Sequence, residues 1–355
     1  MPPGSHGRCA AAGVLPCCRR GPARCRHAAG ECAAGAPRPR LGAAGARRAA
    51  AGFTWDLMER STLLGMSDED EQYQRKLLDL LNESQSFEAY MADVPAWRVE
   101  DRSSLAADDQ RIHPYELSHA VRHSLVIAID HLRGLRQQMV TGPVPQERRK
   151  RRRMHVQLGL APYAPLTMAR GAIENAAKAV WMISPPGRLD RVKRRIGVRA
   201  GELDNAHQLH KTIGVDPKIP LEQRRQKLLD LLTQAGVPEH EATEFVKKPP
   251  KHRRIVREAG ESTPLGRDLV ILWSMCSAVA HGELTATLGL LEREVIRREN
   301  GVVLARVTGQ WSLVFWAALA ARDLIARGLN LYQERARRYV AGWMGWGGAR
   351  STAPW

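Results

Sequence analysis

The stretch "LTMARGAIENAAKAVWMI" (Leu166 to Ile183) predicts a long helix at the centre of the fold. The helix should stop before Pro185-Pro186, because a residue that precedes proline disfavours the helical conformation. Each helical residue turns the chain by about 100°, so Arg170, Glu174 and Trp181 share one stripe. A large aromatic residue on such a stripe usually faces inward. We therefore expect an inward-facing helix whose Arg170 and Glu174 pair at i,i+4.

Helical patterns continue on both sides of this stretch. Apolar residues recur at spacings of three and four in "YELSHAVRHSLVIAIDHLRGLRQQMV", and the composition, with nine Trp among few aromatics, suits a helical core. The segment 187–213 is strongly charged and is predicted to face the surface. Residues 93–114 are interpreted as a linker. The sequence predicts helices at about 67–91, 115–140, 166–183, 187–213, 221–236, 238–248 and 310–338, and one that carries Ser277 and ends at Gly282.

One β signal stands out, in "EVIRRENGVVLARV" (Glu294 to Val307). Asn300-Gly301 lies between two β-branched runs, and Asn-Gly is the strongest short hairpin cue. We expect strands at about 294–299 and 302–308. The fold class is therefore mainly α, a helical bundle with one β-hairpin near 294–308.

The N-terminal 57 residues differ from the rest of the chain. They are rich in Ala, Gly, Pro, Arg and Cys and contain almost no large apolar residue. Such a segment cannot bury a core, so residues 1–57 are predicted to be a disordered tail. An alternative is that translation begins later, at Met66 or Met58. Residues 58–112 are then an N-terminal helix and linker, and residues 113–345 the bundle domain.

The charge balance predicts an anionic partner. The formal net charge is +17 and the isoelectric point is about 10.2, which favours nucleic acid or another anionic surface. Two basic runs would contact phosphates without reading bases. One is Lys247–Arg254, and the other comprises Arg148, Arg149, Lys150, Arg151, Arg152 and Arg153. The alternative is that both runs are solvated loops.

Polar residues also lie on faces that carry apolar ones. Ser277 and His281 are four residues apart on the face of Trp273, and His123 and Asp130 share a stripe of the helix at 115–140. We expect His281 to contact Glu174 and Arg170 in one buried cluster, with His123 and Asp130 as further members. The alternatives are separate surface pairs, and for His281 a capping role beside Gly282.

Three segments carry a family resemblance: "HSLVIAIDHL", "ARGAIENAAKAVWMI" and "SAVAHG". They resemble uncharacterised actinobacterial helical proteins and, more distantly, the HEPN-like superfamily of helical bundles. Many members of that superfamily cut RNA as dimers with an Arg and a His. The resemblance implies an RNA partner, a homodimer and a catalytic role for His281. Arg170, Glu174 and Ser277, its expected neighbours in the polar cluster, are the other candidate catalytic residues. No arginine stands four to six residues before His281, so only the histidine matches the motif.

Three functions remain open from the sequence. The first is a HEPN-like protein that binds or cuts RNA, and the second is a non-enzymatic scaffold or dimerisation module. The third is a metal or small-molecule enzyme that uses the same polar cluster. We expect no cofactor, because the chain lacks a GxxxxGK[ST] loop, a GxGxxG after a strand and an HExxH helix. No apolar segment reaches the roughly 20 residues of a membrane span, and the cysteine usage fits the cytoplasm.

Overall fold

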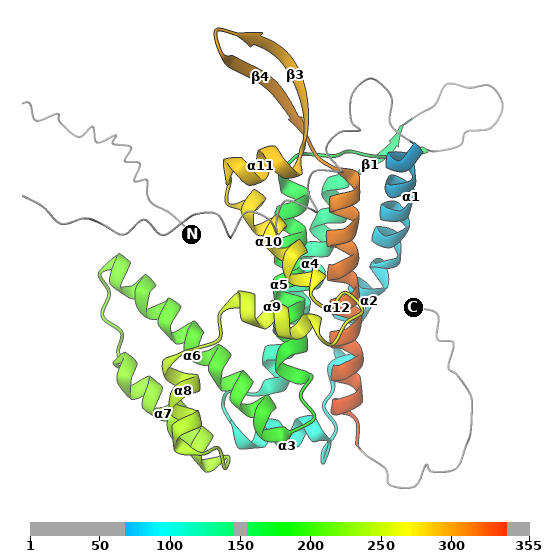
Figure 1. Ribbon diagram of the computed structural model, residues 1–355. Helices are drawn as coiled ribbons and strands as arrows, with labels where there is room; N and C mark the ends of the chain where they lie inside the picture. Colours follow the sequence, from blue (N-terminus) through cyan, green and yellow to red (C-terminus); the bar gives the residue numbers. More distant parts are fainter. Residues whose placement is uncertain (1–67, 145–154, 339–355) are drawn as a thin grey trace, which may run out of the picture. The chain divides into compact units, whose positions relative to one another are not determined.

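Three long helices pack side by side in the computed structural model, which describes residues 68–144 and 155–338 (Figure 1). They are α4 (Leu117–Met139), α5 (Ala164–Ile183) and α12 (Trp311–Ala336). The predicted fold class is confirmed: the protein is mainly helical, and the expected β-hairpin is present. The helix predicted at 166–183 is α5, the central one of the three.

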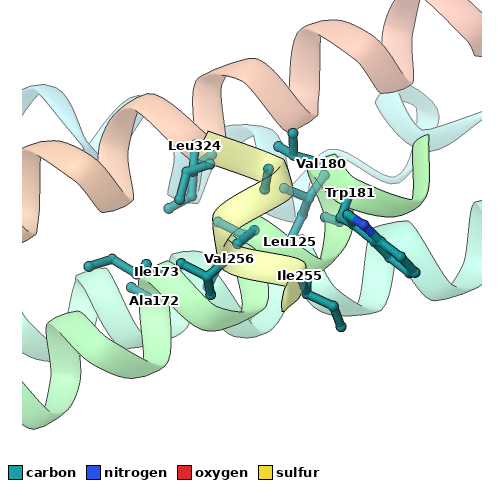
Figure 2. Close-up of a cluster of buried hydrophobic side chains, with 14 of the residues drawn as sticks. Leu125, Ala172, Ile173, Val180, Trp181, Ile255, Val256 and Leu324 are labelled. Carbon is teal, nitrogen blue, oxygen red and sulfur yellow. The ribbon is translucent and has the colours of Figure 1, made fainter. Parts of the chain in front are cut away.

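Small residues let these helices approach closely. Buried alanines line α5, among them Ala172 and Ala176, each with no exposed surface. On α12, a Cβ added to Gly328 would lie 2.7 Å from Cδ2 of Leu125 on α4, so no larger residue fits there without a shift. Figure 2 shows Leu125, Ile173, Val180 and Leu324 in this shared core. Close packing of this kind supplies the dispersion and burial that hold a helical bundle together.

The residues before α4 join the same core. The helix predicted at 67–91 is broken at Ser84 into α1 (Asp68–Glu83) and α2 (Gln85–Ala92). The segment interpreted as a linker contains η1 (Val94–Trp97) and α3 (Ser104–Arg111), and Trp97 is only 4% exposed. The linker interpretation was therefore wrong. Pro95 and the polar residues of α3 are typical of a loop, although both short helices have a buried apolar side.

The charged helix α6 (Arg188–Ile213) contributes to the interior, contrary to expectation. Arg191 is 2% exposed, and Val192 and Ile196 beside it are fully buried. α6 also packs against α7 (Leu221–Gln234) and α8 (Glu239–Lys247). The surface prediction rested on the number of charged residues in this segment. It was wrong because that number does not distinguish a buried arginine from an exposed one.

Three shorter helices follow α8 in the chain, and two of them pack against α5. α9 (His252–Gly260) and α10 (Asp268–Ala280) both contact α5, and α11 (Leu284–Leu290) follows α10. Figure 2 shows Ile255 and Val256 of α9 in the cluster formed with α5 and α12. These two apolar residues fix which side of α9 faces out.

The predicted hairpin consists of β3 (Glu292–Glu299) and β4 (Val302–Thr308), which pair antiparallel and project from the end of the helices (Figure 1). Asn300 and Gly301 have φ of 49° and 77°, the positive values that a two-residue hairpin turn needs. A second antiparallel pair was not predicted: β1 (Val140–Val144) and β2 (His155–Leu158). There the sequence indicated only the end of a helix and a basic segment.

Several predictions fall outside the described residues. The tail at 1–57, the basic run at 148–153 and the end of the domain at 345 belong to this group. The boundaries at 57, 112 and 345 therefore stay predictions.

Candidate functional site around helix α9

The predicted Arg170–Glu174 pair is present on α5. Arg170 Nη2 lies 3.4 Å from Glu174 Oε2, and the two side chains are 28% and 18% exposed. Trp273 of α10 donates from Nε1 to the same carboxylate oxygen at 3.3 Å. Residues of two helices therefore meet at Glu174, as the helical faces indicated.

The histidine at this carboxylate is His252, and it belongs to α9. Its Nδ1 lies 3.1 Å from Glu174 Oε1. The helical faces predicted His281 at this position, and that prediction was wrong. His252 stands in the basic run and begins a helix whose Ile255, Val256 and Ala259 face inward. A helical projection of 252–260 places His252 near the side of α9 that carries these buried residues.

His281 lies instead at the end of α10, where it is exposed. Across the described parts of the chain, the side chains of Ser277 and His281 have neither a hydrogen bond nor an ion pair. Gly282 has φ of 69°, and Gly282 N and Glu283 N donate to Val279 O and Ala278 O at 3.0 Å each. The Ser-x-x-x-His-Gly ending is thus a left-handed C-terminal cap, the structural alternative raised for His281.

His123 and Asp130 do not join the cluster. Both are exposed on α4, whose buried side carries Val121, Leu125 and Ala128. Their shared stripe is real but faces away from the core. The correct inward stripe was the apolar one beside it.

The second basic run is described, and it is exposed. Lys247, Lys248, Lys251 and Arg253 are all exposed, as is Arg257 one turn further along α9. Among residues 68–144 and 155–338, none of these five side chains has an ion-pair partner. We call these five residues the α9 basic surface. Arg148 to Arg153 lie outside the described residues, in the segment that joins β1 to β2.

A second carboxylate of the site, Glu258 of α9, accepts hydrogen bonds from three donors. Trp181 donates from Nε1 to Oε2 and Arg254 from Nε to Oε1, each at 2.7 Å, and Arg194 Nη2 donates to Oε2 at 3.5 Å. Burial acts to raise the pKa of Glu258, but the hydrogen bonds from Arg254 and Trp181 outweigh it, so the pKa lies below its ordinary value. Glu258 is therefore a firmly ionised group at neutral pH.

Arg194 is fixed by the same tryptophan. Its Nη1 donates to Trp181 O at 2.7 Å, and its guanidinium carbon lies 4.7 Å from the centroid of the indole ring. Such a cation–π contact holds the guanidinium in one orientation. The sequence did not single out either Arg194 or Glu258, because partners far apart along the chain give no local pattern.

These groups line a cleft of about 560 Å³. Its walls come from the end of α5, the start of α6, α8, α9 and α12. Four cationic and three acidic side chains line it: Lys193, Arg194, Arg254, Arg327, Asp190, Glu258 and Glu261. A concave site of this size is in the usual range for small ligands, roughly 300–1,000 Å³.

Two further observations concern other kinds of site. Over the described residues, no three or more His, Cys, Asp or Glu side chains are grouped so that they could hold a metal ion. Also within that part of the chain, no single helix is long and apolar enough to cross a membrane. The pair α10 and α11 meets that criterion only when taken together, across a bend of 119°.

Comparison with family models, with curated proteins and with solved structures gave no match for this chain. The resemblance to HEPN-like proteins therefore stays a prediction, carried by the sequence segments alone.

Proposed function

We propose that this protein binds RNA through the α9 basic surface. The observation that carries the proposal is the exposure of Lys247, Lys248, Lys251, Arg253 and Arg257 without ion-pair partners in the described parts of the chain. Unpaired surface cations release condensed counterions when they contact phosphates, and that release drives nucleic-acid binding. The excess positive charge of the whole chain acts in the same direction.

The support beneath this surface is rigid. Ile255 and Val256 are 3% and 0% exposed, and they fix α9 against α5. Glu258 holds Arg254, and Glu174 holds His252, so the helix is also tied by polar contacts. A surface of Lys and Arg on such a support would contact the RNA backbone without selecting a base sequence.

Cleavage of the bound RNA would fall to His281. Imidazole is the side chain that most often serves as a general acid or base, and His281 is exposed. Arg170 would not assist it in the described arrangement, because that guanidinium pairs with Glu174. RNA incubated with the full chain and with the His281→Ala form tests this extension separately from binding.

The binding test is a salt titration with matched variants. Anisotropy of a labelled single-stranded RNA is measured from 50 to 200 mM salt, concentrations over which phosphate contacts weaken steeply. A triple Lys→Gln change at Lys247, Lys248 and Lys251 should reduce the slope of log K against log salt by about 2, since each single-strand contact contributes about 0.7.

The control removes the same charge elsewhere. Lys211, Lys218 and Lys227 are exposed on α6, α7 and the loop between them, and their change to Gln should leave the slope nearly unaltered. Equal losses in both triple variants would reduce the effect to net charge alone. A wild-type affinity that does not vary with salt would refute the proposal.

A second function has one specific observation in its favour, the exposed apolar hairpin. Val295, Ile296, Val302, Val303 and Leu304 are between 47% and 68% exposed. A two-stranded hairpin is marginal by itself in water, and exposed apolar strands favour association. A dimerisation module would therefore show concentration-dependent sedimentation that Val303→Lys abolishes and that the lysine variants above retain.

A further inference from the structure

We infer that the cleft between α5, α6, α9 and α12 binds the phosphate group of a small phosphorylated ligand, a site separate from the α9 basic surface. The inference goes beyond RNA binding, because the cleft is concave and its volume, about 560 Å³, is in the range of small-ligand sites. It rests on the hydrogen-bonding groups of the lining: guanidinium donors remain free, whereas most carboxylate acceptors are already used.

The walls of the cleft carry guanidinium N–H donors that have no acceptor in the described structure. Arg254 uses Nε for Glu258, which leaves the two terminal nitrogens of its guanidinium without a recorded partner. Arg327 is exposed and, within the described residues, has no ion pair or hydrogen bond. These two guanidinium groups line the same cleft from α9 and α12. Guanidinium groups suit phosphate oxygens because they offer two parallel N–H donors.

The acceptors are largely consumed. Both oxygens of Glu258 already accept hydrogen bonds, and Asp190 pairs with Lys193 at 2.9 Å. Lys193 is also paired with Glu241 at 2.8 Å, which leaves it little capacity for a ligand. Glu261 is the one carboxylate of the lining for which the described structure records no ion pair. It would repel a bound anion, so its removal should tighten binding.

Arg194 gives the cleft its fixed wall. The contact with the ring of Trp181 and the hydrogen bond to Trp181 O hold its guanidinium in place before any ligand arrives. A positive group that needs no reorganisation binds an anion at a lower entropic cost. Phe245, also in the lining, offers an apolar ring, and Lys193 Nζ lies 5.9 Å from the centroid of that ring.

The experiment is calorimetric titration of the full chain with three probes: inorganic phosphate, adenosine and adenosine 5′-monophosphate. Saturable binding of phosphate and of the monophosphate, but not of adenosine, is expected. Arg327→Ala should weaken the monophosphate about tenfold, the usual effect of one lost charged hydrogen bond. Glu261→Gln should strengthen it. Arg327 is exposed and unpaired in the described structure, so its removal should not disturb folding, which circular dichroism checks.

The matched control is Arg257→Ala, which removes an exposed arginine of the α9 basic surface outside the cleft. It should weaken RNA and leave the monophosphate unchanged, whereas Arg327→Ala should do the reverse. Failure of RNA binding with intact phosphate binding would thus overturn only the proposed function. No saturable phosphate binding, equal binding of adenosine, or no effect of Arg327→Ala would overturn the cleft site.

A competition arm identifies the source of the phosphate. Displacement of the monophosphate by a 5′-phosphorylated oligonucleotide, but not by its unphosphorylated form, assigns the site to an RNA end and supports the inference. Displacement by neither form assigns it to a free small molecule and also supports it. Equal displacement by both forms would show that phosphodiesters suffice, and the separate site would be rejected.

Discussion

Arg191 and Asp108 form a buried, two-point ion pair: Nε lies 2.6 Å from Oδ2 and Nη2 lies 3.0 Å from Oδ1. The other guanidinium arms are also used, since Nη1 donates to Pro185 O and Pro186 O and Nη2 donates to Ser104 Oγ. The pair therefore joins α3 to α6 and to the turn that ends α5. Such a network stabilises the fold only while both partners are present, because the loss of one leaves the other as a buried charge without a partner.

Removal of one partner should be costly. Asp108→Ala should lower the free energy of unfolding by about 3–5 kcal/mol, because it leaves Arg191 buried and uncompensated. Chemical denaturation measures this. The double form Asp108→Leu with Arg191→Met should recover much of the loss. Glu222→Ala, which breaks an exposed pair with Arg225, should cost less than about 1 kcal/mol. Similar costs for both single changes would contradict the account.

Glu174 should couple to His252 and not to His281. A double-mutant cycle of Glu174→Ala with His252→Ala should give a coupling energy of about 0.5–1 kcal/mol, because half of the His252 side chain is exposed. The same cycle with His281→Ala should be additive, since that side chain lies at the exposed end of α10. Coupling with His281 of the larger size would restore the cluster first expected from the sequence.

The acid stability of the protein should depend on Glu258. Its pKa is lowered in the folded state, although burial opposes this, because Arg254 and Trp181 donate to it. The stabilisation is then complete above the ordinary glutamate pKa, about 4.3, and is lost as the pH falls through the lower folded value. Glu258→Gln should reduce stability at pH 7 and flatten its decline between about pH 5 and 3, as thermal melts will show. If the Glu258→Gln form lost stability between pH 5 and 3 as steeply as the wild type does, these hydrogen bonds to Glu258 would not be the cause of its acid sensitivity.

Gly328 lies so close to Leu125 that an added methyl group should destabilise the protein. Gly328→Ala should destabilise the protein by about 1–3 kcal/mol, because the new Cβ would meet a leucine that is fully buried. Gly289→Ala in α11 is the control, since its Cβ would meet no atom within 4 Å. That change should be neutral or stabilise by up to about 1 kcal/mol. Leu125→Ala in the Gly328→Ala background should cost less than it does alone.

Cys276 should resist alkylation in the native protein. Burial raises the pKa of its thiol to about 12, despite a lowering contribution from Arg170, so the reactive thiolate is scarce at neutral pH. Iodoacetamide treatment at pH 7, followed by peptide mass mapping, should leave Cys276 unmodified until denaturant is added. Rapid native labelling would mean that α10 opens readily from α5.

The elements that local patterns define were predictable. Asn300-Gly301 predicted the hairpin because the turn needs positive φ at both residues, and α5 was recognised from periodicity and the prolines after it. The site was predictable only in part. The pairing of Arg170 with Glu174 is local to one helix, whereas the choice of His252 over His281 depends on how α9 packs on α5. Periodicity describes one helix at a time and contains no information on which helices become neighbours.

The buried ion pair shows the same limit more strongly. Asp108 and Arg191 are 83 residues apart, and each stands in a segment whose composition is typical of a surface. Nothing local distinguishes an arginine that will be enclosed from one that stays in water. The distinction comes from the backbone carbonyls of Pro185 and Pro186, which need donors once α5 ends.

The placement of α12 has a consequence for the order of synthesis. Its Tyr332 Oη donates to Trp97 O at 2.9 Å, Arg335 donates to the carbonyls that end α5, and Glu100 N donates to Ala336 O. The earlier helices thus acquire these partners only from the last helix of the described chain. A ribosome that has made α1 to α11 carries a set of helices with an open apolar side, so this chain should depend on chaperones until residue 336 has emerged.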